Sequence, residues 1–234
     1  MAQNHAVQKG KPDGSFLAQT LLFRGAAPEE IPPMLDCLAA KRRVFRKGEA
    51  VYRAGDSVRE IGLVLSGRVQ IESDDLWGNR SVLDSIGPGA VFAETYACIP
   101  EEPLLVNAVA AEPSEILFLD AGRILQTCPA ACARHARLIR NLLAISARKN
   151  LNLSRRIFHT SSKSIRGRLL SYLSFQAARQ GSRDFRIPFN RQQLADYLSV
   201  DRSALSNELS KMRREGLLRV EKNHFYLPEP GREG

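Results

Sequence analysis

Residues 188–227 constrain the fold of this chain more than any other stretch. Asn190 and Gln193 have the spacing of a capping box, which is typical of a helix start. A short apolar stripe follows, formed by Leu194, Ala195 and Leu198. Residues 199–201 then read as a tight turn, and Asp201 is placed to cap the next segment. The pattern predicts two short helices that are joined by this turn.

The second predicted helix has one apolar and one polar face. Its inward positions are Leu205, Leu209 and Met212, at helical spacing. Gly216 is a natural stop after the last turn. Residues 217–220 and 225–227 then read as two strands around a turn at 221–224. This order is the layout of a winged helix-turn-helix, whose second helix enters the major groove of DNA.

The polar face of the second helix and its surroundings supply the predicted contacts to DNA. Arginine pairs well with guanine and asparagine with adenine in the major groove. The predicted DNA-binding residues are Arg191, Gln192, Arg202, Ser203, Ser206, Asn207, Lys211 and Lys222. The alternative is an ordinary helical hairpin packed in a core. The polar outer face, the wing that follows and the local positive charge all favour the DNA-binding interpretation.

Charge is divided unevenly along the chain. The 34 Lys+Arg and 25 Asp+Glu give a formal net charge of +9. From residue 131 onward there are 21 basic and 8 acidic residues, whereas the first 130 residues hold 13 basic and 17 acidic ones. A slightly acidic part joined to a basic part fits a sensor domain followed by a nucleic-acid-binding domain, since phosphate contacts require a basic surplus.

Length and composition place the chain among two-domain proteins. The 234 residues suit two domains, and residues 1–20 are polar enough to predict a flexible N-terminus. No apolar run reaches about 18 residues, and the N-terminus lacks the apolar core of a signal peptide. We therefore expect a cytoplasmic protein without a membrane partner. In that compartment the four cysteines are not expected to form disulfides.

Residues 43–120 carry short apolar runs that are broken by glycine. The runs include residues 61–65, 69–71, 82–86, 106–110 and 116–119. Strands at this spacing, with turn signals between them, predict an all-β sandwich or barrel. The segments KGEAVYRAGDSVREIGLVLSGRVQI and GPGAVFAETYAC resemble the cyclic-nucleotide-binding β-roll of the Crp–Fnr superfamily of bacterial transcription regulators. With the downstream helix-turn-helix, the resemblance spans about residues 35–227.

The resemblance implies an α+β protein with three functional parts. These are an antiparallel β-roll (double-stranded β-helix) effector domain at 21–128, a dimerisation helix at 129–158 and a winged helix-turn-helix domain at 159–234. Family members are homodimers that bind double-stranded DNA. Dimer symmetry implies an inverted repeat with half-sites about 34 to 36 Å apart. RNA polymerase is a further candidate partner of a regulator of this kind.

The segment between roll and helix-turn-helix has the sequence of one long helix. Pro129 suits a first helical position, and residues 130–158 contain neither Gly nor Pro. One apolar row, Leu138, Leu142 and Ile145, is predicted as the dimer interface. A second row consists of Ile139, Leu143, Leu153 and Ile157. One row can meet a partner helix while the other covers the roll. Residues 158–162 are predicted as a hinge before a further helix at 165–180.

The resemblance also implies where an effector binds. The expected pocket residues are Phe92, Ala93, Glu94, Leu105, Leu138 and Leu142. Members that bind cyclic AMP have a Glu at the position of Glu94, followed by an Arg-Ser pair for the cyclic phosphate. Here that pair falls at about Glu101-Glu102-Pro103, which provides no bidentate cation. We therefore predict an effector other than cyclic AMP. Glu94 has the alternative role of a turn residue that binds backbone amides.

Other signals and other classes of protein remain as alternatives. An iron–sulfur cluster needs N-terminal cysteines, and residues 1–36 contain none. Cys128 and Cys132, spaced i, i+4, could form a redox or metal pair or fill space, and His135 could ligate haem. We expect no resident metal, haem or iron–sulfur group, and leave an unidentified small-molecule effector open. No catalytic motif occurs, which argues against an enzyme.

The recognition helix itself departs from familiar relatives. Many family members carry Glu at the position of Ser203 and Arg at that of Asn207, whereas Arg202 matches the shared Arg. The departures predict a half-site other than the usual one. A different-class alternative is an architectural protein that binds DNA without regard to sequence. The sequence leaves open the effector, the operator, and whether the protein activates or represses.

Overall fold

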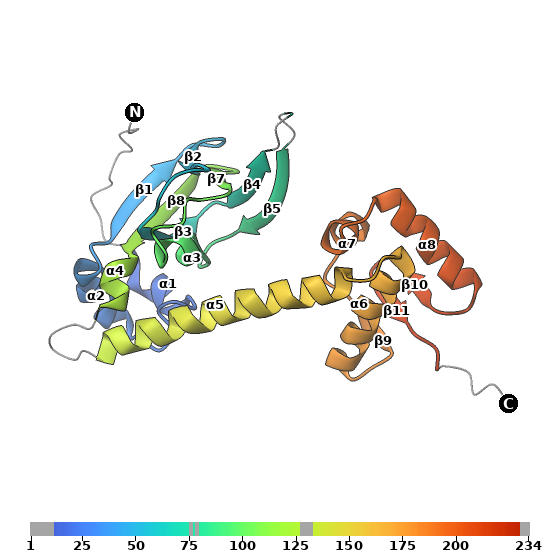
Figure 1. Ribbon diagram of the computed structural model, residues 1–234. Helices are drawn as coiled ribbons and strands as arrows, with labels where there is room; N and C mark the ends of the chain where they lie inside the picture. Colours follow the sequence, from blue (N-terminus) through green and yellow to red (C-terminus); the bar gives the residue numbers. More distant parts are fainter. Residues whose placement is uncertain (1–11, 75–76, 78–79, 127–132, 230–234) are drawn as a thin grey trace. The chain divides into compact units, whose positions relative to one another are not determined.

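The computed structural model describes residues 12–74, 77, 80–126 and 133–229. The chain divides into two compact units, residues 1–148 and 149–234. The long helix α5, Ala133–Thr160, begins in the first unit and ends in the second (Figure 1). Each unit has its own hydrophobic core.

Eight strands build the β-roll of the first unit. They are β1 (Lys41–Phe45), β2 (Ala50–Tyr52), β3 (Glu60–Ser66), β4 (Val69–Asp74), β5 (Arg80–Ile86), β6 (Val91–Phe92), β7 (Asn107–Ala110) and β8 (Ser114–Asp120). They form two four-stranded sheets, in the orders β1-β8-β3-β6 and β2-β7-β4-β5, and all pairings are antiparallel. The chain passes repeatedly from one sheet to the other, which makes a roll. The predicted antiparallel β-roll is confirmed.

The roll encloses a core in which aromatic rings meet small residues. Phe92 and Phe118 are each at most 1% exposed, and both rings contact Tyr52 edge-on. A Cβ at Gly62 would lie 2.3 Å from the Phe92 ring, so only glycine lets β3 and β6 pair at that point. Gly67 has a φ of 78° and approaches the Pro113 carbonyl closely, which fixes the turn between β3 and β4.

Short helices and the first part of α5 form a second core in the same unit. They are α1 (Gly14–Gln19), a 3-10 turn η1 (Pro28–Glu30), α2 (Ile31–Cys37), α3 (Glu94–Ala97) and α4 (Ala121–Leu125). Residues 14–19, which lie within the N-terminus predicted to be flexible, are helical. Asp13 caps α1 and Leu17 is fully buried, so tertiary packing holds a helix that is too short to show periodicity.

The helix α5 continues beyond the end that the sequence predicted. Its described start is Ala133, and residues 127–132 lie outside the described chain. It ends at Thr160, where the Thr160 hydroxyl donates to the Arg156 carbonyl at 2.8 Å. The predicted hinge at 158–162 therefore begins inside the helix. Helix α6, Ile165–Gln180, follows with the bounds the sequence predicted, and Ser164 caps it.

The second unit has the helix-turn-helix and a small sheet. Helices α7 (Arg191–Leu198) and α8 (Arg202–Arg214) are followed by β10 (Arg219–Glu221) and β11 (His224–Tyr226). A third strand, β9 (Asp184–Arg186), pairs with β11 and was not predicted, because three residues carry too little alternation. The predicted strand boundaries shift by a few residues, and the turn narrows to Lys222 and Asn223. The winged helix-turn-helix is confirmed.

Candidate nucleic-acid interface

The helix α8 is fixed at its start by the cap that the sequence predicted. The Asp201 carboxylate accepts from the Ala204 amide at 2.8 Å. The Ser203 hydroxyl also donates to it, and this bond together with the Ala204 amide lowers the pKa of Asp201. The inward side chains of α8 are Leu205, Leu209 and Met212, which are 0 to 2% exposed. The opposite face of α8 is therefore presented to solvent in a fixed orientation.

The exposed face of α8 carries several of the predicted DNA-binding residues. Arg202, Asn207 and Lys211 are exposed, and their side chains make no hydrogen bond with the rest of the described chain. Ser203 and Ser206 differ, because their hydroxyl protons already donate to Asp201 and to the Arg202 carbonyl. The two serines keep only acceptor capacity, whereas arginine, asparagine and lysine keep their donors.

The remaining predicted contacts lie outside the exposed face of α8. Arg191 opens α7 and is partly buried, which lowers its pKa. Gln192 uses its amide to donate to Asp196 at 2.8 Å. Lys222 is exposed in the wing turn with a φ of 54°. Arg214 was not among the predicted residues, yet it is exposed two turns beyond Asn207 on the same face, a spacing visible in the sequence.

Arginines fasten the helix-turn-helix to the helices beside it. The Arg156 guanidinium, from the last turns of α5, donates to the carbonyls of Tyr197 and Asp196 at 3.1 and 2.9 Å. Arg168 of α6 donates to the next two carbonyls, those of Leu198 and Ser199, at 3.0 and 2.9 Å. Together they donate to four consecutive carbonyls at the end of α7, of which that of Asp196 also accepts from the Ser199 amide. The end of α5 and the helix α7 are thereby bonded directly.

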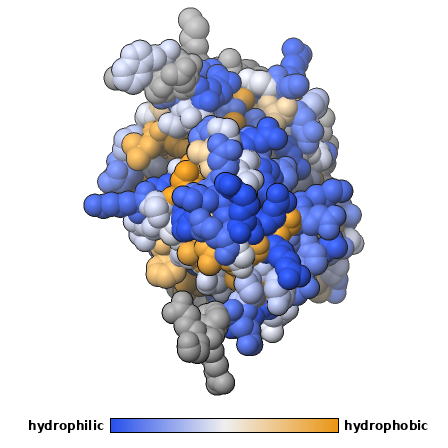
Figure 2. All heavy atoms as spheres, turned by 90° about the vertical axis from the view of Figure 1, so that its right-hand side faces the viewer, coloured by the Kyte–Doolittle hydropathy of each residue, from blue (hydrophilic) through white to orange (hydrophobic). Residues whose placement is uncertain are grey.

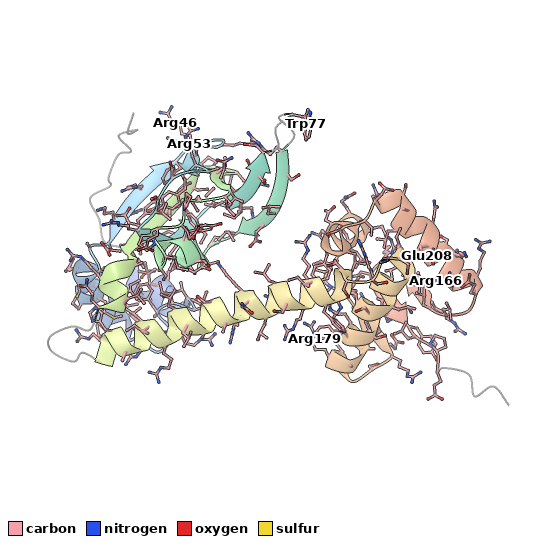
Figure 3. The ribbon with its side chains drawn as sticks, in the orientation of Figure 1. Arg46, Arg53, Trp77, Arg166, Arg179 and Glu208 are labelled. Carbon is pink, nitrogen blue, oxygen red and sulfur yellow. The ribbon has the colours of Figure 1, made fainter. Side chains whose placement is uncertain are left out.

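A second set of ion pairs joins α6 to α8. Arg166 lies beside Glu208 in Figure 3, with an N–O distance of 2.6 Å, and also reaches Glu215 at 2.7 Å. The guanidinium lowers the pKa of Glu215. Because one arginine contacts both a residue within α8 and its C-cap residue Glu215, it fixes the rotation of that helix about its axis as well as its position.

His159 lies in a buried aromatic group of the same unit. Its ring is 1% exposed, and its Nδ1 lies 3.1 Å from the Ser171 hydroxyl. The rings of Tyr172, Phe175 and Tyr197 surround it at centroid distances of 5.1 to 6.2 Å. Burial, followed by the nearby charge of Arg155, lowers the pKa of His159. The neutral imidazole is therefore the form that this packing favours.

The surface of the second unit is strongly polar. Its side facing the viewer in Figure 2 is mostly hydrophilic, with hydrophobic side chains only in small groups. Exposed arginines and lysines of this unit include Arg202, Lys211, Arg213, Arg214, Arg219 and Lys222. A surface of this composition suits phosphate contacts around the exposed face of α8.

The predicted effector residues are not gathered in one place. Phe92 belongs to the core of the roll, whereas Leu138 and Leu142 belong to the second core beside α5. Leu105 is 77% exposed, so it lines no enclosed pocket. Glu94 is 3% exposed at the start of α3, after Ala93 in a left-handed conformation with a φ of 60°. Glu101 and Glu102 are exposed in the loop after α3.

The two apolar rows of α5 have different surroundings. The row that the sequence assigned to the dimer interface, Leu138, Leu142 and Ile145, is 1 to 6% exposed within the core of its own unit. The structure thus contradicts the assignment of this row to a partner chain, because contacts with the unit's own core already cover it. In the second row, Leu143, Leu153 and Ile157 are 62 to 69% exposed.

The structure adds no support to the alternatives in which the chain holds a metal ion or haem. Within the described residues there is no group of three or more side chains that could hold a metal ion. Cys128 and Cys132 lie outside the described residues. His135 is buried at the start of α5. No helix among the described residues is both long and apolar enough to cross a membrane.

Comparison with known proteins agrees with this geometry. Residues 42–130 match the family model of the cyclic nucleotide-binding domain, and residues 167–232 match that of the Crp-like helix-turn-helix domain. The class is therefore that of DNA-binding transcription regulators in which a winged helix-turn-helix follows a cyclic-nucleotide-binding-like roll. Within that class, the chain belongs to the Crp–Fnr family.

Individual relatives cover most of the chain. The cyclic AMP receptor protein of Thermus thermophilus is 29% identical over 85% of this chain and 88% of its own length. The transcriptional activator protein FnrA of Stutzerimonas stutzeri is 24% identical over 80% and 76%. The solved structure of the c-di-GMP-responsive global regulator CLP of Xanthomonas campestris has a TM-score of 0.55 at 19% identity, covering 86% of this chain and 99% of that one. The last likeness concerns the fold alone.

Proposed function

We propose that this regulator binds an inverted-repeat operator as a homodimer and acts in the cytoplasm. The observation that carries the proposal is the exposed face of α8, where Arg202, Asn207 and Lys211 have unused donors above a rigid, capped helix. Arginine and asparagine at such positions suit guanine and adenine edges. Phosphate contacts come from the basic surface around them, including Lys222 of the wing and Arg214.

The dimer forms through the exposed row of α5. Leu143, Leu153 and Ile157 repeat at helical spacing on a helix of 28 residues, and each is more than 60% exposed in the single chain. A row of large apolar side chains along a helix is stabilised when a second helix covers it. Paired α5 helices would bring two α8 helices onto one duplex, so the operator would carry the symmetry of the dimer.

The signal that sets DNA affinity acts through the first unit and is not cyclic AMP. Residues 81–122, which include α3 and the loop after it, contain neither Lys nor Arg. A cyclic phosphate bound against this segment would meet no cation from it, and the buried Glu94 adds a carboxyl group. An anion in a site of that composition is disfavoured. Contact with RNA polymerase belongs to the same proposal, as the step through which a bound regulator alters transcription.

Selection of bound sequences from a random DNA pool tests these proposals. The purified full-length protein is used with and without cyclic AMP, and the enriched sequences are compared. We expect one palindromic motif that is enriched equally in both conditions. A motif that appears only with cyclic AMP would overturn the effector proposal. Absence of any enriched motif would contradict sequence-specific reading and favour architectural binding, in which specific and random DNA compete almost equally.

A further inference from the structure

A cysteine and a histidine from distant parts of the chain meet in the first unit. Cys37 is the last residue of α2 and is exposed, whereas His135 lies on α5 and is 8% exposed. The Cys37 sulfur lies 3.7 Å from Nε2 of His135. This distance is that of a thiol–imidazole hydrogen bond. The sulfur lies on the solvent side of the ring.

The Cys37 sulfur is the hydrogen-bond partner of Nε2 of His135. Nδ1 of His135 is buried and has no hydrogen-bond partner among the described residues. A buried polar atom without a partner costs about 1 to 3 kcal/mol, so a histidine that served only to fill space would be a poor choice here. The ring is therefore held with Nε2 aimed at the thiol. At this position Nε2 can take the proton of the thiol as the sulfur reacts, which is the role of a general base.

Charged side chains of both signs lie around the pair. The Arg123 guanidinium donates to the Cys37 carbonyl at 3.2 Å. Arg134 and Arg137 flank His135 along α5 and both pair with Glu30, at 3.7 and 2.9 Å. Exposed thiols near cations and histidine are the reactive ones in proteins. Cys98 offers a contrast within the same unit, because burial and then Glu94 raise the pKa of its thiol.

We propose that Cys37 is a site of covalent modification, at which hydrogen peroxide oxidises the thiol with the assistance of His135. The ionised sulfur attacks one peroxide oxygen, the O–O bond breaks, and the departing hydroxide takes the proton that the thiol had lost. The products are a sulfenic acid at Cys37 and one water, with sulfur oxidised by two electrons and the peroxide reduced by two. This chemistry requires neither DNA nor an effector.

Peptide-resolved labelling of the full-length protein tests the proposal. The reduced protein is treated with hydrogen peroxide and dimedone at pH 7 and then digested with trypsin. Cleavage places Cys37 in fragment 25–41, Cys98 in fragment 81–123, and Cys128 with Cys132 in fragment 124–134. Fragment 25–41 should be labelled about tenfold faster than 81–123, and about tenfold faster than in the urea-unfolded chain, because His135 lies beside the Cys37 sulfur only in the folded protein and can take its proton.

A substitution at His135 isolates the role of the ring. His135→Leu keeps an apolar side chain in the buried position and removes both nitrogens. Labelling of 25–41 should fall about tenfold, while labelling of 81–123 in the same sample should not change. Equal labelling of 25–41 in the native and unfolded protein would overturn the proposal, and so would a folded His135→Leu variant with an unchanged rate. The comparison of native with unfolded wild-type protein is decisive even if the variant fails to fold.

Discussion

At the scale of single residues, the second unit combines exposed polar side chains that make no hydrogen bond within the described chain with polar side chains that the fold already uses. Arg202 and Asn207 keep their donors on the exposed face of α8, whereas the hydroxyl proton of Ser203 is committed to the helix cap. The buried His159 is a third kind, a titratable group held neutral by its surroundings. Each kind responds to substitution or to pH in a different way.

Arg202→Ala and Asn207→Ala test base reading by α8. Each substitution should weaken binding to the selected operator by about 1 to 3 kcal/mol, because a base contact is lost, and should leave thermal unfolding unchanged. Fluorescence anisotropy on operator and on random DNA gives the two affinities. A loss of the same size on random DNA would mean that these residues contact phosphates instead.

Protonation of His159 links the stability of the second unit to pH. Its pKa in the folded state lies below the ordinary value of 6.5, so the unfolded chain takes up the proton first as pH falls. The free energy of unfolding should therefore decrease below about pH 6.5, by at most about 1.4 kcal/mol per pH unit for one proton.

Urea unfolding between pH 5 and 8, followed by near-ultraviolet circular dichroism, measures this dependence. In His159→Phe the part of the decrease that belongs to this ring should be absent. Arg155, Ser171 and the two tyrosines face the ring from α5, α6 and α7 and remain in place as its surroundings. A wild-type protein that becomes more stable on acidification would contradict the assignment.

At the scale of elements, α5 contributes to both units of the chain. One side chain row is buried against the first unit and a second row is exposed, while the end of the helix is bonded to α7 through Arg156. Because that bond lies within the second unit, the last turns of α5 move with α7.

Substitutions at the neighbouring residues Leu142 and Leu143 test folding and dimerisation separately. Leu143→Glu should abolish the dimer and leave the fold intact, since this side chain is 69% exposed in the single chain. Leu142→Glu should destabilise the first unit by about 3 to 5 kcal/mol, since it buries an unpaired charge at a position that is 4% exposed. Sedimentation velocity and chemical denaturation measure the two effects. A stable dimer of Leu143→Glu would exclude this row as the interface.

Arg156 and Arg155 form a second matched pair. Arg156→Ala removes two charged hydrogen bonds to the end of α7, so the second unit should lose about 1 to 3 kcal/mol of unfolding free energy and bind its operator less tightly. Arg155→Ala removes the same charge, a hydrogen bond to the Asn152 side chain at 3.4 Å and a cation–π contact with Phe175 at 5.5 Å, and its effect should be smaller. If both variants lost the same unfolding free energy and the same operator affinity, the effect of Arg156 would come from its charge and not from its hydrogen bonds to α7.

At the scale of the whole molecule, local signals were sufficient to predict the architecture. The caps at Asn190 and Asp201 and the stop at Gly216 are readable in sequence because each depends on residues a few positions away. The strands of the roll were likewise marked by glycines at their turns. Together with the family resemblance, these signals located both the effector domain and the DNA-binding domain.

Features that depend on distant parts of the chain could not be predicted. Both rows of α5 are apolar, so the sequence could not tell that Leu142 meets its own core and Leu143 does not. The short helix α1 is held by burial of Leu17 rather than by periodicity. The contacts of Arg156 with α7 join residues about 40 positions apart, beyond the reach of any local pattern.

The mass of the complex on a selected operator tests the central claim, that two chains read one inverted repeat. Native mass spectrometry of the protein with the intact operator should give two chains per duplex. Scrambling one half-site should lower the affinity by several kcal/mol, since each mismatched base pair costs about 1 to 3 kcal/mol. One chain per duplex, with an affinity that does not depend on the second half-site, would contradict the dimeric account.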